Sequence, residues 1–357
     1  MFAQKLLDWY AEQGRNLPWR GTSDPYRIWL SEIILQQTRI EQGWDYYERF
    51  LAEYPTIQHL AAASEQQVLK TWQGLGYYSR ARNMHNAAQY IVNELGGQFP
   101  ETYEGILALK GVGRYTAAAI ASFAYRLPHP VIDGNVYRLI ARLYGIYTPI
   151  ATDAAYREFE ALLLKLIDRR RPDLFNQAIM DFGSIWCKPV GCDCDHCIFQ
   201  QECVAHREGK VAMLPVKQPK VAVKKRYFFY LDIRWEEDGQ EMTLMQQRES
   251  GDIWQGLYEL PLYESDNPMG NPEATQATNL TFFSDLLGQW FGQEPDTLAL
   301  GPAIQHQLTH RTICARFIVA KYSARPAAIP PKYSILSRAE TKKLPVPRLI
   351  DRYLSSL

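Results

Sequence analysis

Four cysteines near the middle of the chain are spaced closely enough to hold one metal centre. They follow the pattern C-x6-C-x2-C-x5-C and are Cys187, Cys194, Cys197 and Cys203. Short cysteine spacings in a reducing compartment indicate metal binding more often than disulfides. Zinc favours two C-x2-C pairs, and only the central pair here has that form. The wider outer arms favour a [4Fe–4S] cluster, with zinc or no metal as the alternatives.

Two further cysteines test this interpretation. Cys192 lies inside the cysteine loop and offers an alternative ligand, because it forms the pattern C-x-C with Cys194. Cys314 follows much later in the apolar run HRTICARFIV, where we expect a small core residue. The sequence pattern alone therefore leaves the ligand set open at Cys192.

Two carboxylates stand in settings that could support acid–base chemistry. Glu32 lies in the apolar run WLSEIILQQT. Burial there would raise its pKa and make it a general acid near neutral pH, whereas on the polar edge of an amphipathic helix it would be a surface residue. Asp133 lies in PVIDGNVYRL, directly before a helical pattern, where an aspartate predicts an N-cap.

A glycine turn precedes another helical pattern in LKGVGRYTAAAIASFA. Gly111 and Gly113 would let the backbone approach a ligand closely. The free N–H groups of the helix N-terminus then favour a phosphate as that ligand. The alternative is a tight turn without a binding role.

Composition limits the class of protein. The chain has 357 residues, enough for two domains, with 39 Lys+Arg against 39 Asp+Glu. We find no run of about 18 apolar residues and expect no membrane span. The amphipathic start MFAQKLLDWYAEQG does not resemble a signal peptide, so we expect a cytoplasmic protein.

The sequence pattern changes once along the chain. Apolar residues recur at helical spacing through 1–206, with Ser64 and Asp153 as expected N-caps. Strand patterns such as RYFFYLDIRW and ICARFIVAKY follow, mixed with a few helical ones. We therefore expect an all-helical domain over 1–206, a linker over 207–226 and an α+β domain over 227–357. The linker is basic and could either lie on a phosphate backbone or serve only as a soluble connection.

Taken in order, these motifs resemble those of the helix-hairpin-helix DNA glycosylases that carry an iron–sulfur cluster. The order is SEIILQQT, GLGYYSRARN, LKGVGRYTA, VIDGNV and the four cysteines, over 9–204. Within that superfamily the chain resembles the MutY-type adenine DNA glycosylases. The C-terminal half resembles the Nudix-like (MutT-like) domain of that family. It lacks the run G-x5-E-x7-R-E-x2-E-E, so we expect no nucleotide hydrolysis there.

The resemblance implies a base-excision repair enzyme that flips adenine out of duplex DNA and cuts its N-glycosidic bond. The adenine would pair with 8-oxoguanine or guanine. Glu32 would be the general acid, and Asp133 would stabilise the oxocarbenium-like sugar, with Tyr115 and Asn135 in support. The family spacing also implies a [4Fe–4S] cluster held by the four cysteines at 187–203, with Cys194 rather than Cys192 as ligand.

The resemblance implies further site residues. A phosphate-binding turn would comprise Gly111 and Gly113, and an adenine pocket would comprise Trp19, Arg20 and Gln177. The residues that would wedge into the duplex or contact the lesion are Gln37, Tyr77, Leu308, Thr309 and His310. Leu308 stands where the family has an aromatic ring. Tyr115 stands where related glycosylase/lyases have a lysine, and Tyr137 stands where some members have one after DGNV. We therefore expect a monofunctional enzyme without Schiff-base chemistry.

The expected partner is double-stranded DNA with adenine opposite 8-oxoguanine or guanine. We expect a monomer on nucleoid DNA, and we find no motif for a protein partner. One alternative is a pyrimidine or mismatch glycosylase of the same superfamily, against which Tyr115 and the Nudix-like domain argue. Another is a DNA-damage binding protein with an inert cleft, against which Glu32 and Asp133 argue.

Overall fold

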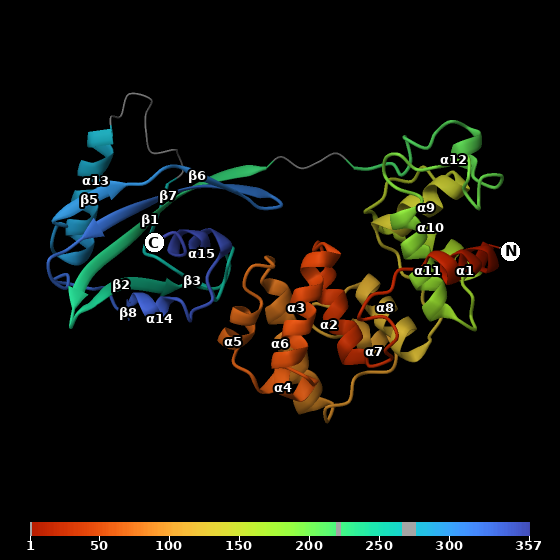
Figure 1. Cartoon of the computed structure of the whole chain (residues 1–357), viewed down its shortest axis with the longest axis horizontal. Helices are drawn as coiled ribbons and strands as arrows, with labels where there is room; N and C mark the ends of the chain where they lie inside the picture. The colour runs from red at the N-terminus through yellow and green to blue at the C-terminus, as the bar shows by residue number, and fades with distance from the viewer. Residues whose placement is uncertain (1, 219–222, 266–275) are drawn as a thin grey trace. The chain divides into compact units, whose positions relative to one another are not determined.

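The computed structural model of the chain describes residues 2–218, 223–265 and 276–357 (Figure 1). Its internal contacts divide the chain into two compact units. The first comprises 1–63 and 83–219, and the second comprises 64–82 and 220–357. The second unit thus joins a short helical segment to the C-terminal half, a grouping that the sequence pattern did not indicate. Within the described ranges, no helix is long and apolar enough to cross a membrane.

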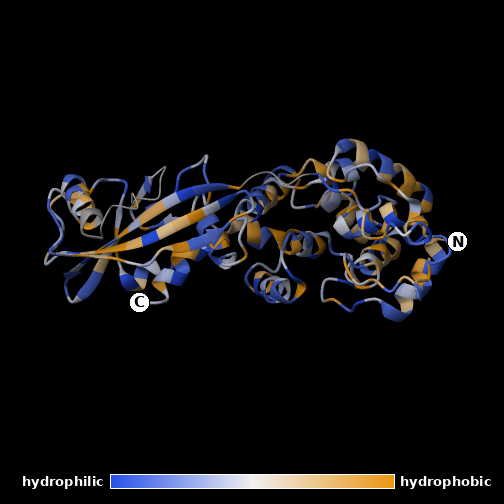
Figure 2. Ribbon diagram, turned by 90° about the horizontal axis from the view of Figure 1, so that it is seen from above, coloured by the Kyte–Doolittle hydropathy of each residue, from blue (hydrophilic) through white to orange (hydrophobic). Residues whose placement is uncertain are grey.

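The first unit is built from helices, as the helical periodicity predicts. They are α1 (Phe2–Gln13), α2 (Pro25–Leu35), α3 (Ile40–Glu53), α4 (Ile57–Ala62), α6 (Ser79–Glu94), α7 (Tyr103–Leu107), α8 (Arg114–Tyr125), α9 (Gly134–Tyr144), α10 (Asp153–Leu166), α11 (Pro172–Ile185) and α12 (Val204–Arg207). α6 begins within the segment 64–82. Figure 2 shows hydrophobic and hydrophilic residues mixed along these helices, as amphipathic helices require.

Side-chain caps set where several helices begin. Ser64 forms a capping box with Gln67, so its expected role as an N-cap is confirmed. Asp153 was expected to cap α10, and this expectation is wrong by one residue. Thr152 is the N-cap, because its side chain accepts the hydrogen bond from the Ala155 N–H. Asp153 is the first helical residue, where a carboxylate still suits the positive end of the helix.

The core of the first unit lies between α1, α9, α10 and α11. Phe159, Phe175 and Phe182 are fully buried in it. Gly183 on α11 lets this helix approach the start of α9 closely. A Cβ at position 183 would lie 2.8 Å from the backbone oxygen of Asn135. The packing therefore fixes the turn that carries Asp133 and Asn135 against the core.

The second unit contains a mixed sheet with helices on its faces. Its elements are α5 (Glu65–Thr71), β1 (Lys224–Glu237), β2 (Gln240–Gln247), β3 (Tyr258–Glu259), β4 (Leu262–Ser265), α13 (Gln276–Phe291), β5 (Thr297–Leu300), β6 (Ile304–Gln307), β7 (Arg311–Lys321), β8 (Ser334–Ser337), α14 (Arg338–Thr341) and α15 (Arg348–Leu354). The strand order is β3-β2-β1-β7-β5, with β4 beside β1, β6 beside β7 and β8 beside β2. β1 and β7 are parallel. The expected fold class, a helical domain followed by an α+β domain, is confirmed.

The long strand β1 supplies both faces of the sheet. Phe229 and Leu231 pack in the cluster that contains α13. Phe228 and Tyr230 pack in the cluster that contains α15. Alternate residues of a strand point to opposite faces, so one apolar run can support a helix on each side.

Part of the segment expected to be a linker packs on the first unit. Leu214 is buried in the core of that unit, and the Ile150 N–H donates a 2.9 Å hydrogen bond to the Val216 carbonyl. β1 begins at Lys224, inside the expected range 207–226. Lys220 of this basic segment lies outside the described residues. The proposed domain boundaries at 206 and 227 stay predictions.

Candidate active site and cysteine cluster

A cavity of about 230 Å³ lies in the first unit, where α2, α8, α9 and α11 meet the segment after α1. The predicted catalytic and adenine-pocket residues all line it: Trp19, Arg20, Glu32, Tyr115, Asp133, Asn135 and Gln177. The fold thus gathers, in one place, residues that lie far apart in the sequence.

Glu32 on α2 is only 7% exposed, so the alternative of a surface glutamate is wrong. Burial raises the pKa of its carboxyl to about 7, and the nearby Asp133 charge acts in the same direction. A hydrogen bond from Tyr115 and the charge of Arg20 oppose this shift. A carboxyl with such a raised pKa can hold its proton near neutral pH and donate it.

Asp133 is the N-cap of α9, as predicted. Its Oδ1 accepts the N–H groups of Asn135 at 2.9 Å and Val136 at 2.8 Å. Its Oδ2 accepts the Asn135 side-chain amide at 2.7 Å. Burial raises the pKa of this carboxyl, while these hydrogen bonds and the charge of Arg138 oppose the rise. Both oxygens are therefore held in a fixed direction at the cavity.

Tyr115 is the second residue of α8 and lies close enough to Glu32 and Asp133 to feel the charge of both. Burial raises its pKa well above the ordinary value, and the negative charges of Glu32 and Asp133 raise it further. Its hydroxyl lies 3.4 Å from the Met180 Sδ. Tyr115 is therefore a neutral hydrogen-bond donor at neutral pH, and it offers no amine to the cavity.

A buried carboxylate that the sequence analysis missed holds Arg20, a predicted adenine-pocket residue. Asp181 is fully buried and accepts two hydrogen bonds of 2.7 Å from Arg20. Arg15 also donates to it, at 2.9 Å through Nε. Burial alone would raise the pKa of Asp181, but the bonds from both arginines hold it below its ordinary value. Asp181 follows Gln177 by four residues, and this helical spacing was the available signal.

Tyr10 on α1 orients the Gln177 side chain. The Tyr10 hydroxyl donates a 2.8 Å hydrogen bond to the Gln177 Oε1. Arg20 in turn donates to the Tyr10 oxygen at 3.2 Å. The amide NH2 group of Gln177 then remains as the donor of this side chain.

The glycine turn lies between α7 and α8 and forms a helix-hairpin-helix. Gly111 has a φ of 80°, and a Cβ there would lie 2.5 Å from the Asn83 Cβ, so only glycine fits. Gly113 is the N-cap of α8, and a Cβ there would meet nothing within 4 Å. As a glycine, it brings no side chain over the first N–H groups of α8.

The expected wedge and lesion residues lie in different units. Gln37 belongs to the first unit, whereas Tyr77 and residues 308–310 belong to the second. Gln37 and Tyr77 both have positive φ values, 56° and 47°, and both are exposed. Thr309 and His310 are exposed between β6 and β7, and Leu308 is half-buried. The Tyr77 and Thr309 hydroxyls form a hydrogen bond. Positive φ is costly for residues with a Cβ, and such strain is frequent at functional sites.

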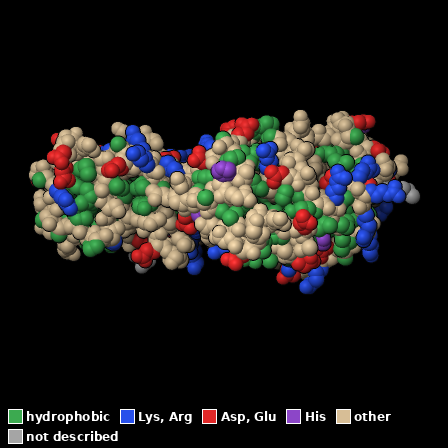
Figure 3. Space-filling view, turned by 90° about the horizontal axis from the view of Figure 1, so that it is seen from below, with side chains coloured by type: hydrophobic (Ala, Val, Ile, Leu, Met, Phe, Trp, Pro, Cys, Tyr) green, Lys and Arg blue, Asp and Glu red, His purple; other side chains and the backbone are tan. Residues whose placement is uncertain are grey.

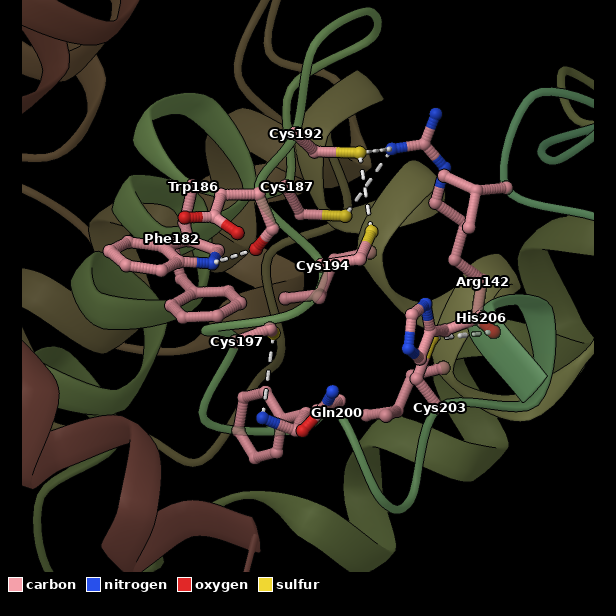
Figure 4. A pocket seen from close by; sticks show the side chains of 15 residues that line it. Arg142, Phe182, Trp186, Cys187, Cys192, Cys194, Cys197, Gln200, Cys203 and His206 are labelled. Atoms are coloured by element: carbon pink, nitrogen blue, oxygen red, sulfur yellow. Dashed lines mark hydrogen bonds between the residues drawn. The ribbon is translucent and has the colours of Figure 1, made fainter. Parts of the chain in front are cut away.

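The four predicted cysteine ligands line a second cavity in the first unit, together with Cys192 (Figure 4). Cys192 Sγ lies 3.6 Å from Cys194 Sγ. Among the described residues, no three His, Cys, Asp or Glu side chains converge on a position for one metal ion. The four thiols line one cavity, and four cysteine thiols are the ligand set that an iron–sulfur cube requires. Cys314 is half-buried in β7, in the other unit.

The fold and its two sites define a class of DNA repair protein. Residues 30–167 match the HhH-GPD superfamily of base excision DNA repair proteins, and residues 233–356 match the NUDIX domain family. The helical half is similar to a thermostable thymine-DNA glycosylase, with 27% identity and a TM-score of 0.55, over 58% of this chain and 95% of that one. A trapped endonuclease III–DNA complex shares the fold, with a TM-score of 0.51 and 20% identity, over 58% of this chain and 95% of that one.

Curated relatives narrow the class to one family. The chain is 31% identical to the adenine DNA glycosylase of Buchnera aphidicola subsp. Schizaphis graminum (strain Sg) over 266 residues, 74% of this chain and 76% of that protein. It is 41% identical to the adenine DNA glycosylase of Rattus norvegicus over 226 residues, 60% of this chain. The chain belongs to the adenine DNA glycosylase family, a family of DNA N-glycosylases. It spans less than half of the rat protein, 44%.

Proposed function

We propose that this chain is a monofunctional adenine DNA glycosylase that acts on adenine paired with 8-oxoguanine or guanine and leaves an abasic site. The observation that carries this proposal is Glu32, a buried carboxyl with a pKa of about 7 in the same cavity as Asp133. Two carboxyls in different environments are a common device for hydrolysing a glycosidic bond, one donating a proton and one stabilising positive charge.

In the proposed reaction, Glu32 donates its proton to N7 of a flipped adenine. The electron pair of the glycosidic bond then leaves with the base, and the sugar takes on oxocarbenium character. Asp133 forms a transient bond to the sugar, and water displaces it with overall retention while the Glu32 carboxylate takes up the proton of the water. The hydrogen bonds from Asn135 and Val136 aim the Asp133 carboxylate for this step.

The proposed adenine pocket contains two side chains, Arg20 and Gln177, that hydrogen bonds from other residues hold in place. Asp181 fixes the Arg20 guanidinium, and Tyr10 fixes Gln177 so that its NH2 group can donate to the base. Trp19 packs edge-on against Tyr47, with ring centroids 5.6 Å apart, and forms an apolar wall of the cavity. Oriented donors of this kind recognise a base that has left the stack.

The monofunctional part of the proposal rests on Tyr115. A phenol cannot form the Schiff base that cuts the DNA strand in lyases. Borohydride treatment during turnover should therefore trap no covalent complex with DNA, and strong trapping would contradict this part.

The proposed DNA contacts lie at specific turns. On the face in Figure 3, basic and acidic side chains both occur, and they form no uniformly basic surface there. Gly111 and Gly113 instead present the start of α8 to a phosphate. Gln37 and Tyr77 would insert beside the mispair, and Thr309, with His310 beside it, would bond to 8-oxoguanine. Leu308 would add only apolar contact. The partner is duplex DNA in the cytoplasm, and a monomer is expected.

The cysteine cavity is proposed to hold a [4Fe–4S] cluster through Cys187, Cys194, Cys197 and Cys203. When bound, the cluster supplies a structural crosslink for the loop 187–203. Arg142 supports the same loop from α9 by donating hydrogen bonds to the carbonyls of Lys188 and Pro189.

Base release from four duplexes tests the proposal. We expect single-turnover release of adenine opposite 8-oxoguanine and guanine, and little release opposite cytosine. Release of thymine from a thymine–guanine duplex with none of adenine would favour the pyrimidine alternative. Tight binding without any base release would favour the binding-protein alternative.

A further inference from the structure

The cysteine cavity contains one thiol more than a four-ligand cluster needs. Cys192 and Cys194 are both half-buried, while Gly191, Asp193 and Asp195 around them are exposed. The loop thus turns two cysteines, two residues apart, toward the same cavity. Figure 4 shows both sulfur atoms on its rim, and 3.6 Å separates them.

A buried cation faces Cys192 as well as a proposed ligand. Arg142 is 3% exposed, and its Nη1 lies 3.7 Å from Cys192 Sγ and 3.5 Å from Cys187 Sγ. The carbonyl of Leu214 fixes the same guanidinium through Nε at 3.0 Å. Cys192 therefore lines the same cavity as the proposed ligands and contacts the same guanidinium as Cys187.

We propose that Cys192 is a reserve ligand, which replaces Cys194 at one iron of the cluster. This inference rests on the proposed [4Fe–4S] centre. In the exchange, the Cys194–iron bond breaks and a Cys192–iron bond forms, while the proton of the Cys192 thiol passes to the Cys194 sulfur. No electron is transferred. The ligand pattern changes from C-x6-C-x2-C to C-x4-C-x4-C, and Cys197 and Cys203 keep their places.

Iron content of freshly purified variants tests this exchange. We expect about four iron atoms per chain in the wild type, and nearly the same in Cys192→Ala and in Cys194→Ala. Cys197→Ala and the double variant Cys192→Ala/Cys194→Ala should lose most of the iron. If Cys194→Ala loses iron as completely as Cys197→Ala, the reserve-ligand role is wrong. A wild type with zinc or no iron would instead contradict the cluster itself.

Alkylation of the intact holoprotein provides a test that needs no substitution. Slow alkylation followed by mass spectrometry should modify some molecules at Cys192 and others at Cys194 while the iron stays bound, because either thiol can be released. Cys314 on β7 serves as the reference thiol. Modification of Cys192 alone, with Cys194 always protected, would overturn the proposal. In Cys194→Ala, the iron should in addition protect Cys192.

Discussion

Arg20 donates two parallel hydrogen bonds, each of 2.7 Å, to the fully buried carboxylate of Asp181. Paired donors of this kind fix the plane of the guanidinium. Asp181 therefore acts on the cavity through Arg20, although it is not among the residues that line the cavity. It is a positioning residue for the proposed adenine pocket.

Asp181→Asn should destabilise the protein and weaken adenine recognition together. Removing the charge leaves Arg15 and Arg20 without their buried partner, which costs about 3 kcal/mol of unfolding free energy. Thermal or urea unfolding measures this loss. Asp173→Asn on the same helix is the control, because Asp173 pairs at 3.8 Å with an exposed Arg126. The loss of unfolding free energy in Asp173→Asn should stay below about 1 kcal/mol. Equal losses in the two variants would contradict the special role of Asp181.

Lowering the pH should remove the contribution of Asp181 to the stability of the folded protein. Its pKa in the folded protein lies below the ordinary value of 3.8. As the pH falls below about 4, the unfolded chain binds this proton first, so stability decreases until the native carboxylate is also protonated. The contribution is complete at higher pH. Wild type and Asp181→Asn should therefore converge in stability below about pH 4, and a constant difference down to pH 2 would contradict this.

Glu32→Gln should stabilise the protein at alkaline pH. The folded pKa of about 7 lies above the ordinary 4.5, so the native state binds this proton more tightly than the unfolded state. Wild-type stability therefore falls as the pH rises from about 4.5 to 7, by roughly 3 kcal/mol at about 1.4 kcal/mol per pKa unit. The melting temperature of Glu32→Gln should exceed that of wild type at pH 8 and approach it at pH 5. The exposed Glu53, as Glu53→Gln, should show no such pH dependence.

Gly111→Ala and Gly113→Ala should separate folding from phosphate binding. At position 111 the positive φ and the contact with Asn83 make alanine destabilising by about 1–3 kcal/mol. At position 113 a methyl group meets open space, so the melting temperature should change little. DNA affinity should nevertheless fall, because the methyl group stands where a phosphate would approach. Wild-type affinity in Gly113→Ala would contradict the phosphate assignment.

Thr309→Ala should lower the preference for 8-oxoguanine over guanine opposite adenine. One lost hydrogen bond corresponds to roughly a threefold to tenfold change in the ratio of single-turnover rates. Tyr77→Phe is the matched control, because it removes the hydroxyl that bonds to Thr309 and keeps the ring. That ratio should be unchanged in Tyr77→Phe. Equal losses of rate on both duplexes in Thr309→Ala would contradict the assignment of Thr309 to 8-oxoguanine recognition.

Local chemistry made parts of the site predictable from the sequence. Asp133 before a helical pattern predicted its N-cap, and Ser64 its capping box, because caps depend on residues three positions away. Glu32 was ambiguous by pattern, since helical periodicity does not distinguish a cavity wall from a polar edge. Its burial depends on α8 and α9, which lie far along the chain. Asp153 was assigned one residue too late, because Thr152 competes for the same N–H groups.

Long-range contacts could not be predicted in this way. Helical spacing from Gln177 could place Asp181 on the same face, but only the packing of α11 against the segment after α1 gives it two arginine partners. The packing of residues 64–82 with the C-terminal half depends on hydrogen bonds such as the one that Lys70 Nζ donates to the Leu344 carbonyl at 3.0 Å. No local pattern marks such a contact.

In the proposed reaction, Glu32 protonates the adenine that leaves. The most direct measurement is single-turnover release of adenine from a duplex with adenine opposite 8-oxoguanine, by wild type and Glu32→Gln at pH 7. Loss of the proton donor should slow release by at least about a hundredfold, while the Kd for the same duplex stays near the wild-type value. Release at the wild-type rate by Glu32→Gln, with DNA binding intact, would contradict the claim.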